Sequence, residues 1–533
     1  MNTDRSGLLT LDRRDLMKMG VGTGVVAMTQ MLNVPHASAL EASESFSKET
    51  TNFPHSDITT CTHTGWKNTA NRASGNGPID ETSRKIIEYV SSFDESNLTV
   101  PLTESLNYVM LDCIASLIAG FESEPARICA RLAQKNRSDY KSTVMGYGVT
   151  TTPELAAFAN SSMHRHTDFD INEHVSDIIP GILAMGEALH VTGSQVLIAV
   201  TIGYEVVAAL GYASHGPGRW DTPYVGPATA LAVGKMMGLN EDQLANALSL
   251  ALVPHMPLRV SHTGALSMWK GCHDAEAVRC GVFAALAAQE GMTGPSMPFE
   301  GRNGLWDHNG AAFKDLRFPA LSPDGRLAVQ RTIPKKFPAD GNTQAVLEML
   351  PAFMEWTKVD DIESIRLEMP FGGWQENADP AKWDPRNRET ADHSLPYVIS
   401  RFLIDGTIYL DSYTSEKIMD PAVRQLMEKI VVTPNNTYTH QGQARLTFRA
   451  KSGAELVKSR DVMTETLMTP DEMVSKYNRV CTYKHIADEQ RDRARTQWMN
   501  LKAVKDIAGP IGTLANFGKP LPLADAGLRQ RDA

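Results

Sequence analysis

Cysteine is scarce in this chain: there are six in 533 residues, and no two of them form a C-x-x-C pair. Iron–sulfur clusters and structural zinc sites need thiolates at short, regular spacings, and these six fit neither pattern. The chain also lacks a basic stripe, and its net charge of −10 argues against a nucleic-acid partner. Hydrophobic and charged contents are ordinary, so the length predicts a globular protein of two or three domains.

The first 39 residues are organised as an export signal. Arg13 and Arg14 precede a weakly apolar, Gly/Thr-rich run over 19–32, and the small residues of 37–39 offer a cleavage site. This order predicts a twin-arginine signal peptide over 1–39, with the mature chain beginning near Leu40 and working in the periplasm or otherwise outside the cytoplasm. An amphipathic N-terminal helix is the alternative. Residues 40–84 are rich in small polar residues and predict a flexible arm.

Apolar residues recur at helical spacing through most of 85–344, which predicts a large all-helical domain. The predicted helices cover 102–117, 153–165, 178–190, 194–213, 227–237, 241–253 and 272–290. The 194–213 run is apolar enough to raise the question of a membrane span. Thr201 and Glu205 inside it favour a buried core helix, so no span is expected in the mature protein.

The pattern changes after residue 345. Alternation of period two over 362–369, 430–433 and 444–449 predicts strands, and 393–403 predicts a helix ended by Asp405 and Gly406. Helical patterns return over 470–478 and 484–505. The expected fold is therefore mainly α, with a helical domain over 85–344, a smaller α+β domain over 345–465, a return to the helical domain over 466–510 and a tail over 511–533.

The densest polar run is H-R-H-T-D-F-D-I-N-E-H at 164–174. It contains every type of metal ligand, but His164 and His166 close a helix on which residues two apart face different sides, and the H-E-x-x-H spacing is missing. A metal-dependent hydrolase is therefore the weaker interpretation. Asp177 precedes an apolar run and is interpreted as a helix cap.

Several motifs spread over about 85–505 resemble the MmgE/PrpD family. They are S-M-W-K-G-C at 267–272 before an alanine-rich helix, G-M-T-G-P at 291–295, F-E-G at 299–301, K-K-F-P at 335–338 and H-S-L-P-Y at 393–397. D-F-D-I-N at 168–172 is similar to the family's D-F-[DN]-D-T, and His174 opens a shortened His-x-Ser segment. Family members are cofactor-independent lyases acting on tricarboxylic acids, including 2-methylcitrate dehydratases and cis-aconitate decarboxylases.

The resemblance implies a role for each matching position, with no metal and no cofactor. The implied catalytic residues are Asp168, His174, Lys270 and Tyr397, and the implied substrate-binding residues are Asn172, Lys335 and His393. It also implies a homodimer, and it implies that the α+β domain over 345–465 is a lid domain.

Plainer interpretations exist for these side chains. Lysine is exposed by default, the pair at 335–336 fits a solvated loop, and Tyr397 fits a core tyrosine with a satisfied hydroxyl. The apolar or tiny neighbours of Lys270 favour a site role for that lysine. The chain departs from the family at Ile171, Thr222 and Asn342, which leaves the substrate and the reaction open.

Dehydration of a 3-hydroxy acid sets clear demands on a site. The site must neutralise two or three carboxylates, supply a base for the proton alpha to a carboxylate, and supply an acid for the leaving oxygen. The residues above predict a hydro-lyase similar to 2-methylcitrate dehydratase, acting on a citrate-like di- or tricarboxylic acid. Decarboxylation or epimerisation of a related acid, and an exported carboxylate-binding protein without catalysis, are the alternatives.

Overall fold

The computed structural model describes residues 78–213, 222–309, 316–320, 322, 324–440, 442–461 and 468–523. The predicted signal peptide and nearly all of the predicted arm lie outside this part of the chain. The first helix begins before the arm was expected to end. Asp80 caps α4 (Glu81–Ser92) by accepting from the Ser83 backbone, and Ile86, Ile87 and Val90 are buried in the core.

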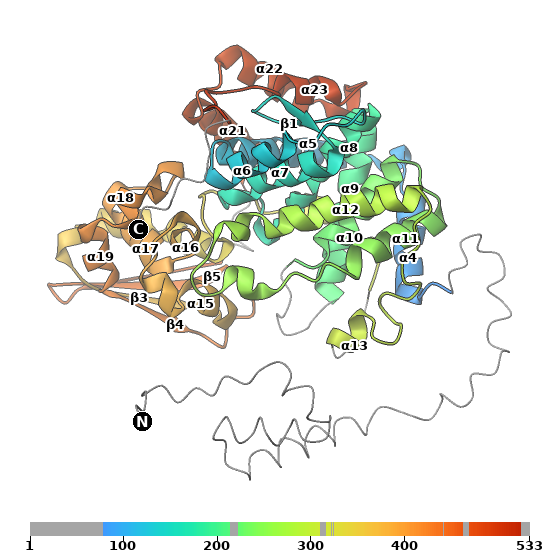
Figure 1. Ribbon diagram of the computed structural model, residues 1–533. Helices are drawn as coiled ribbons and strands as arrows, with labels where there is room; N and C mark the ends of the chain where they lie inside the picture. The colour runs from blue at the N-terminus through green and yellow to red at the C-terminus, as the bar shows by residue number, and fades with distance from the viewer. Residues whose placement is uncertain are drawn as a thin grey trace, which may run out of the picture. The chain divides into compact units, whose positions relative to one another are not determined.

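The first and larger unit of packing is helical (Figure 1). Its helices are α4, α5 (Val100–Gly120), α6 (Glu124–Ala133), α7 (Pro153–His166), α8 (Ile179–Leu189), α9 (Gly193–Ala213), α10 (Val225–Met236), α11 (Glu241–Leu252), α12 (His273–Gln289) and α13 (Leu305–Asn309). A small hairpin, β1 (Ser142–Val144) and β2 (Val149–Thr151), lies beside α7 and α8. Glycine permits a close crossing: a Cβ on Gly281 of α12 would lie 2.5 Å from the Gly226 carbonyl oxygen of α10.

Two described helices, α5 and α9, are long and apolar enough to cross a membrane by length and composition. In each, 78% of the most apolar window is buried inside the protein. Core helices of globular folds pass the same test. Glu205 of α9 is fully buried and accepts hydrogen bonds from the backbone N–H groups of Ala320 and Ala328.

A second core belongs to the α+β domain. Its sheet has the order β4-β3-β5-β6, with β3 and β4 parallel and the other pairs antiparallel. The strands are β3 (Ile362–Met369), β4 (Ile430–Pro434), β5 (Gln443–Ala450) and β6 (Glu455–Asp461), and the helices are α14 (Gln344–Trp356), α15 (Phe371–Asn377), α16 (Arg388–Ala391), α17 (Leu395–Asp405), α18 (Ser415–Ile418) and α19 (Pro421–Met427). Gly406 ends α17 in the left-handed conformation, at φ 80°.

The chain then returns to the helical core. The last helices are α21 (Pro470–Tyr483), α22 (Asp488–Trp498) and α23 (Ala508–Thr513). Figure 1 shows them beside α5 and β1, and α21 packs directly on α5. Folded structure continues past 511, where the tail was expected to start, because Leu514 and Phe517 are buried and Asn516 pairs with Tyr147.

Candidate active site

The polar run at 164–174 folds into the end of α7, a strained turn and the 3₁₀ helix η4 (Asn172–Ile178). Asp168 and His174 both adopt left-handed backbone conformations, at φ 54° and 59°. Each such residue costs of order 1–3 kcal/mol, and such strain concentrates at functional sites. The strain therefore falls on two residues that the sequence singles out.

Arg165 is the centre of this half of the site. Its fully buried guanidinium donates to Asp168, to His174 Nε2 (2.9 Å) and to His262 Nε2 (3.0 Å). Burial lowers its pKa, but the surrounding carboxylates outweigh that effect and hold the pKa well above its ordinary value. Arg165 is thus a fixed cation that orients two imidazoles and one carboxylate.

His174 is held as a neutral imidazole. Its Nδ1 lies 2.6 Å from Asp170 Oδ2, and its Nε2 faces the Arg165 donor, so the proton is on Nδ1. Burial and the Arg165 charge lower the pKa of His174, against the opposing effect of Asp170. The Nε2 lone pair accepts from Arg165, and it can serve as a general base once that donor turns to another acceptor such as a carboxylate.

Lys335 reaches the same turn through backbone pairing. Ile171 forms a β-bridge with Pro334, and the Lys335 N–H donates to the Asp170 carbonyl at 3.3 Å. The ammonium then lies 2.8 Å from Asp168 Oδ1 and 3.3 Å from Asp170 Oδ1. Burial raises the pKa of Asp168, but Lys335, Lys270 and Arg165 outweigh it and hold that pKa well below its ordinary value. Lys335 is therefore a buried site cation and not a solvated loop residue.

The other half of the site consists of residues of the α+β domain and of Lys270, which contacts them from the helical domain. Lys270, in η6 (Met268–Gly271) of the helical domain, is fully buried, and its Nζ lies 2.8 Å from Asp392 Oδ2. The second Asp392 oxygen lies 2.7 Å from His393 Nδ1. His393 Nε2 lies 3.5 Å from Asp340 Oδ2 and has no hydrogen-bond partner. A continuous path of polar contacts therefore joins the two domains.

The remaining predicted site residues fall in two places. Asn172 packs against the turn after Asp340: a Cβ on Gly341 would lie 2.0 Å from Asn172 Oδ1. Asn342 donates to Asp340 Oδ1 at 2.9 Å. Tyr397 lies one layer behind, because its hydroxyl donates to the Ser412 carbonyl and its ring stacks towards Tyr413, with centroids 6.1 Å apart. The structure thus places Tyr397 as the core tyrosine with a satisfied hydroxyl.

Several residues in the cluster were missed by sequence reasoning. The His262 ring centroid lies 4.9 Å from that of His273 and 5.4 Å from that of His393. Thr222 donates to Asp274 and lies 3.5 Å from His273 Nε2. Asp392 was readable as the acidic neighbour of His393, whereas His262 stands alone in S-H-T-G and gives no signal.

Comparison with known proteins identifies the lineage. Residues 84–314 match the MmgE/PrpD N-terminal domain, and residues 337–500 match the MmgE/PrpD C-terminal domain. The chain belongs to the MmgE/PrpD family. The segment between the two matched domains carries Lys335, so the site is built from both domains and their connection.

Named relatives of this family are distant but cover much of the chain. Human cis-aconitate decarboxylase is 26% identical over 63% of this chain and 73% of its own length. The 2-methylcitrate dehydratase of Salmonella typhi is 25% identical over 66% and 77%, and cis-aconitate decarboxylase of Aspergillus terreus is 26% identical over 86% and 99%. Dehydratases and decarboxylases are lyases, which supports a lyase-type activity in general.

The predicted helix cap at Asp177 takes a different place. No side chain caps α8, which begins at Ile179, and Asp177 is fully buried with its Oδ1 3.2 Å from His164 Nε2. Burial and the nearby Asp274 raise the pKa of Asp177 well above its ordinary value, which favours the protonated acid. Asp177 is therefore a buried acid beside His164 and not a helix cap.

Three groups of buried Asp and His residues have ligand atoms within 4.8 Å of one another, as a metal site would require: His164, Asp170 and Asp177; Asp168, Asp340 and His393; and Asp168, Asp170 and His174. In the two groups that contain Asp168, Lys335 and Arg165 already bind Asp168 Oδ1, and a metal cation there would face both charges. Those two groups are thus better suited to the protein's own ammonium and guanidinium ions than to a divalent cation.

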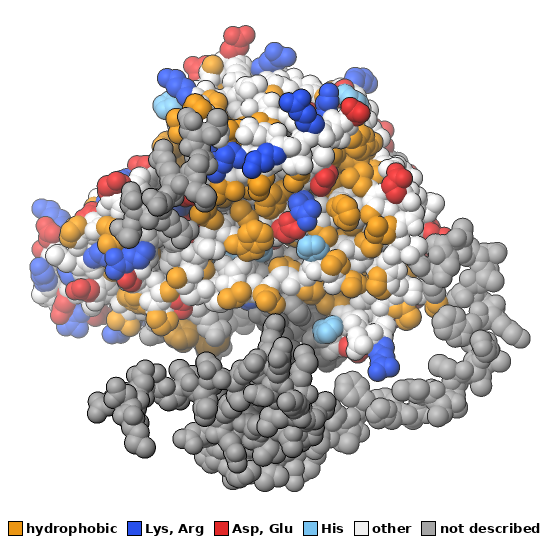
Figure 2. Space-filling model, viewed as in Figure 1, with side chains coloured by type: hydrophobic (Ala, Val, Ile, Leu, Met, Phe, Trp, Pro, Cys, Tyr) orange, Lys and Arg blue, Asp and Glu red, His pale blue; other side chains and the backbone are white. Residues whose placement is uncertain are grey.

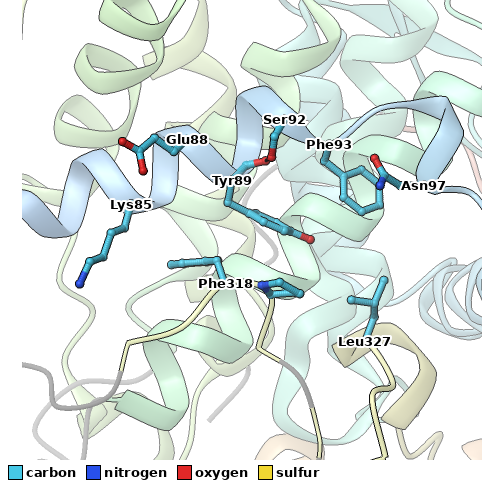
Figure 3. Close-up of a pocket in the computed structure, with 9 residues that line it drawn as sticks. Lys85, Glu88, Tyr89, Ser92, Phe93, Asn97, Phe318 and Leu327 are labelled. Carbon is cyan, nitrogen blue, oxygen red and sulfur yellow. Dashed lines mark hydrogen bonds between the residues drawn. The ribbon is translucent and has the colours of Figure 1, made fainter.

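A pocket of about 730 Å³ lies elsewhere, between α4 and the segment around Phe318 (Figure 3). Tyr89 and Phe93 point from α4 towards Phe318 and Leu327, and the rings of Tyr89 and Phe318 are 5.3 Å apart. Lys85 and Glu88 at its edge are exposed. None of the residues predicted for the site lines this pocket, so it is not a candidate active site.

Proposed function

We propose that this protein is a hydro-lyase that removes water from a citrate-like 3-hydroxy di- or tricarboxylic acid, by proton abstraction alpha to a carboxylate. The observation that carries the proposal is the cluster in which His174 lies between Asp170 and Arg165, and to which Lys335 and Lys270 add two further buried cations. A carbanion next to a carboxylate needs a base to form it and positive charge to stabilise it.

The cations suit carboxylate recognition because each is fixed before the substrate arrives. Lys270 is held by Asp392, and Lys335 by Asp168 and Asp170. A substrate carboxylate entering the cluster would share or replace these aspartate contacts. His174 would take the proton, while Lys335, His393 and Asn172 would position the acid. Preorganised charges of this kind lower a barrier without reorganisation during the reaction.

The substrate class rests on the named relatives, whose names specify 2-methylcitrate and cis-aconitate. Dehydration needs a base that removes a proton and a group that assists the departing hydroxyl. The cluster offers candidates for both, whereas decarboxylation needs no base, so we favour dehydration. Decarboxylation and epimerisation remain variants of the same carbanion chemistry.

Proton NMR in deuterated water tests the proposal on purified mature protein with a panel of di- and tricarboxylates. We expect deuterium to enter alpha to a carboxylate and an olefinic product to appear. Release of carbon dioxide would identify a decarboxylase instead. Binding of the panel without exchange or turnover would contradict catalysis and leave a carboxylate-binding protein.

We further propose export through the twin-arginine pathway, which the residues outside the described part of the chain suggest by sequence alone. Changing Arg13 and Arg14 together to lysine should leave the precursor in the cytoplasm, because the export machinery reads the arginine pair. Cell fractionation with immunoblotting checks this. Normal processing of the double variant would refute the signal.

A homodimer is also proposed. Figure 2 shows hydrophobic side chains gathered over the part of the surface where Figure 1 draws α12. Trp269, Phe283 and Val253 are each about half exposed in η6, in α12 and after α11. Large exposed apolar patches mark association surfaces, and a two-fold dimer would bury the same patch on both copies. Light scattering should give twice the chain mass, and a monomer at micromolar concentration would contradict it.

A further inference from the structure

We infer that His393 is the general acid that protonates the departing hydroxyl group. This inference rests on the proposed dehydration and assigns the step that His174 cannot perform. It comes from the position of His393 alone, between carboxylates on the α+β side of the site and opposite the arginine-bound histidine of the helical side.

The first support is the open nitrogen of His393. The side chain is 1% exposed, and Nδ1 is bound to Asp392 Oδ1 at 2.7 Å. Nε2 has no hydrogen-bond partner, although buried polar atoms nearly always have one. An unpartnered Nε2 in a closed polar cluster is placed to donate to a ligand atom.

The second support is the set of charges that face this ring. Three carboxylates do so: Asp392 at 2.7 Å and Asp168 at 3.8 Å on the Nδ1 side, and Asp340 at 3.5 Å on the Nε2 side. The other neighbour is the ring of His262, with centroids 5.4 Å apart, and Lys270 lies beyond Asp392. The carboxylate at Nδ1 fixes the orientation of the ring, and the ring then presents Nε2 to a ligand atom.

The third support is the contrast with His174. An arginine faces Nε2 of His174, and burial together with that charge lowers its pKa. Two histidines in one cluster therefore sit in opposite electrostatic surroundings. A ring that faces a cation and a ring that faces carboxylates can take the two complementary proton-transfer roles in one site.

The proposed elimination of water transfers two protons. His174 Nε2 takes the proton alpha to the carboxylate, and that electron pair forms the new carbon–carbon double bond. The carbon–oxygen bond at the beta carbon breaks, and the oxygen takes the proton from His393 Nε2 and leaves as water. His174 ends protonated and His393 neutral, and exchange of one proton with solvent resets both groups.

The experiment separates proton removal from elimination. His393→Gln is compared with the wild type for two rates: deuterium entry alpha to the carboxylate, and formation of the unsaturated product. We expect exchange to stay within about threefold, while elimination falls by about 100-fold or more, the usual effect of losing a general acid. His190→Gln is the matched control, because His190 is an exposed surface histidine paired with Asp506.

A second variant tests the inference independently in case His393→Gln does not fold. Asp340→Asn removes the carboxylate that faces Nε2 without changing side-chain size. An acid that loses a neighbouring negative charge gives up its proton more easily, so the alkaline limb of kcat should move to lower pH by about one unit. A merely structural role for Asp340 would lower the rate at every pH without moving that limb.

Equal loss of exchange and elimination in His393→Gln would overturn the inference, as would normal elimination or an unmoved alkaline limb in Asp340→Asn. Those outcomes leave the proposed dehydration standing if the wild type still exchanges and eliminates. Absence of both reactions in the wild type would instead overturn the proposed function and this inference with it.

Discussion

The two halves of the site surround their histidine side chains with groups of opposite charge. In the helical domain, a buried arginine donates to His174 and His262. In the α+β domain, aspartates surround His393. The helical half also carries backbone strain at Asp168 and His174, whereas His393 has an ordinary backbone in the described structure. In the proposed mechanism the base belongs to the helical domain and the acid to the α+β domain, so the reaction requires both domains to be in place.

Breaking the link between the halves should have the largest effect. Lys270→Ala removes the ammonium that joins the helical domain to Asp392. We expect kcat/KM to fall by about 100-fold or more through loss of carboxylate and carbanion stabilisation. Removing one partner of a buried ion pair also costs about 3 kcal/mol of folding stability. Steady-state kinetics and thermal melts measure both.

Lys270→Arg is the companion variant. A planar guanidinium cannot take the place of a compact ammonium, so we expect it to restore charge without restoring activity. Near-normal turnover in either Lys270 variant would remove this lysine from the centre of the site.

Removing the base of the helical half should come next. His174→Gln should lower kcat/KM by about 100-fold, a typical contribution of a general base. The pH profile gives the sign: a base works when it is unprotonated, and burial with Arg165 lowers the pKa of His174. The acidic limb in the wild type should therefore lie below about pH 6.5, the ordinary value for histidine. An acidic limb above that value would contradict a neutral, arginine-bound His174.

A smaller effect should follow from disturbing the contact between the halves without touching charge. A Cβ on Gly341 would lie 2.0 Å from Asn172 Oδ1, so Gly341→Ala must push the two segments apart. We expect a loss of about 1–3 kcal/mol in stability and a raised KM. Gly372→Ala is the control, because nothing lies within 4 Å of its added Cβ. Equal behaviour of the two variants would show that the Asn172 contact is unimportant.

The smallest effect is expected at Lys336, the neighbour of Lys335. Its ammonium lies 3.5 Å from Glu348 and 3.6 Å from Glu472 and is partly exposed. Partly exposed ion pairs contribute about 0–1 kcal/mol, so Lys336→Ala should keep nearly full activity and stability. A large kinetic loss there would shift the carboxylate-binding role from Lys335 to its neighbour.

Local sequence patterns predicted most of the helices and strands of the fold. Strand β3 was predicted at its observed bounds, because Ile362, Ile365 and Leu367 mark a buried face. Strand β6 was missed because it is an edge strand whose residues are mostly exposed or half-buried, which leaves no apolar alternation. The extent of the C-terminal fold was also missed, although Ile507, Ile511 and Leu514 recur at helical spacing and are buried.

The motifs indicated which residues lie close together, but they did not indicate the contacts that set the charge around each residue. Asp168, His174, Lys270, Lys335 and His393 lie in one cluster, and their catalytic and binding roles stay predictions. The sequence could not show that Arg165, at the end of an alanine-rich helix, turns inward to bind two histidines. Such contacts depend on tertiary packing between segments about 100 residues apart.

The surplus of acidic groups in this cluster has a calorimetric consequence. Apart from Asp177, whose surroundings favour the protonated acid, the buried carboxylates belong to Asp168, Asp170, Asp274, Asp340 and Asp392, and the fully buried cations to Arg165, Lys270 and Lys335. A substrate that brings further negative charge into this space cannot enter without compensation, because unbalanced charge at low dielectric is costly. Hydrogen ions from solvent would provide it. Binding heats should therefore vary with the ionisation enthalpy of the buffer, and affinity for the acid should weaken as the solution becomes more alkaline.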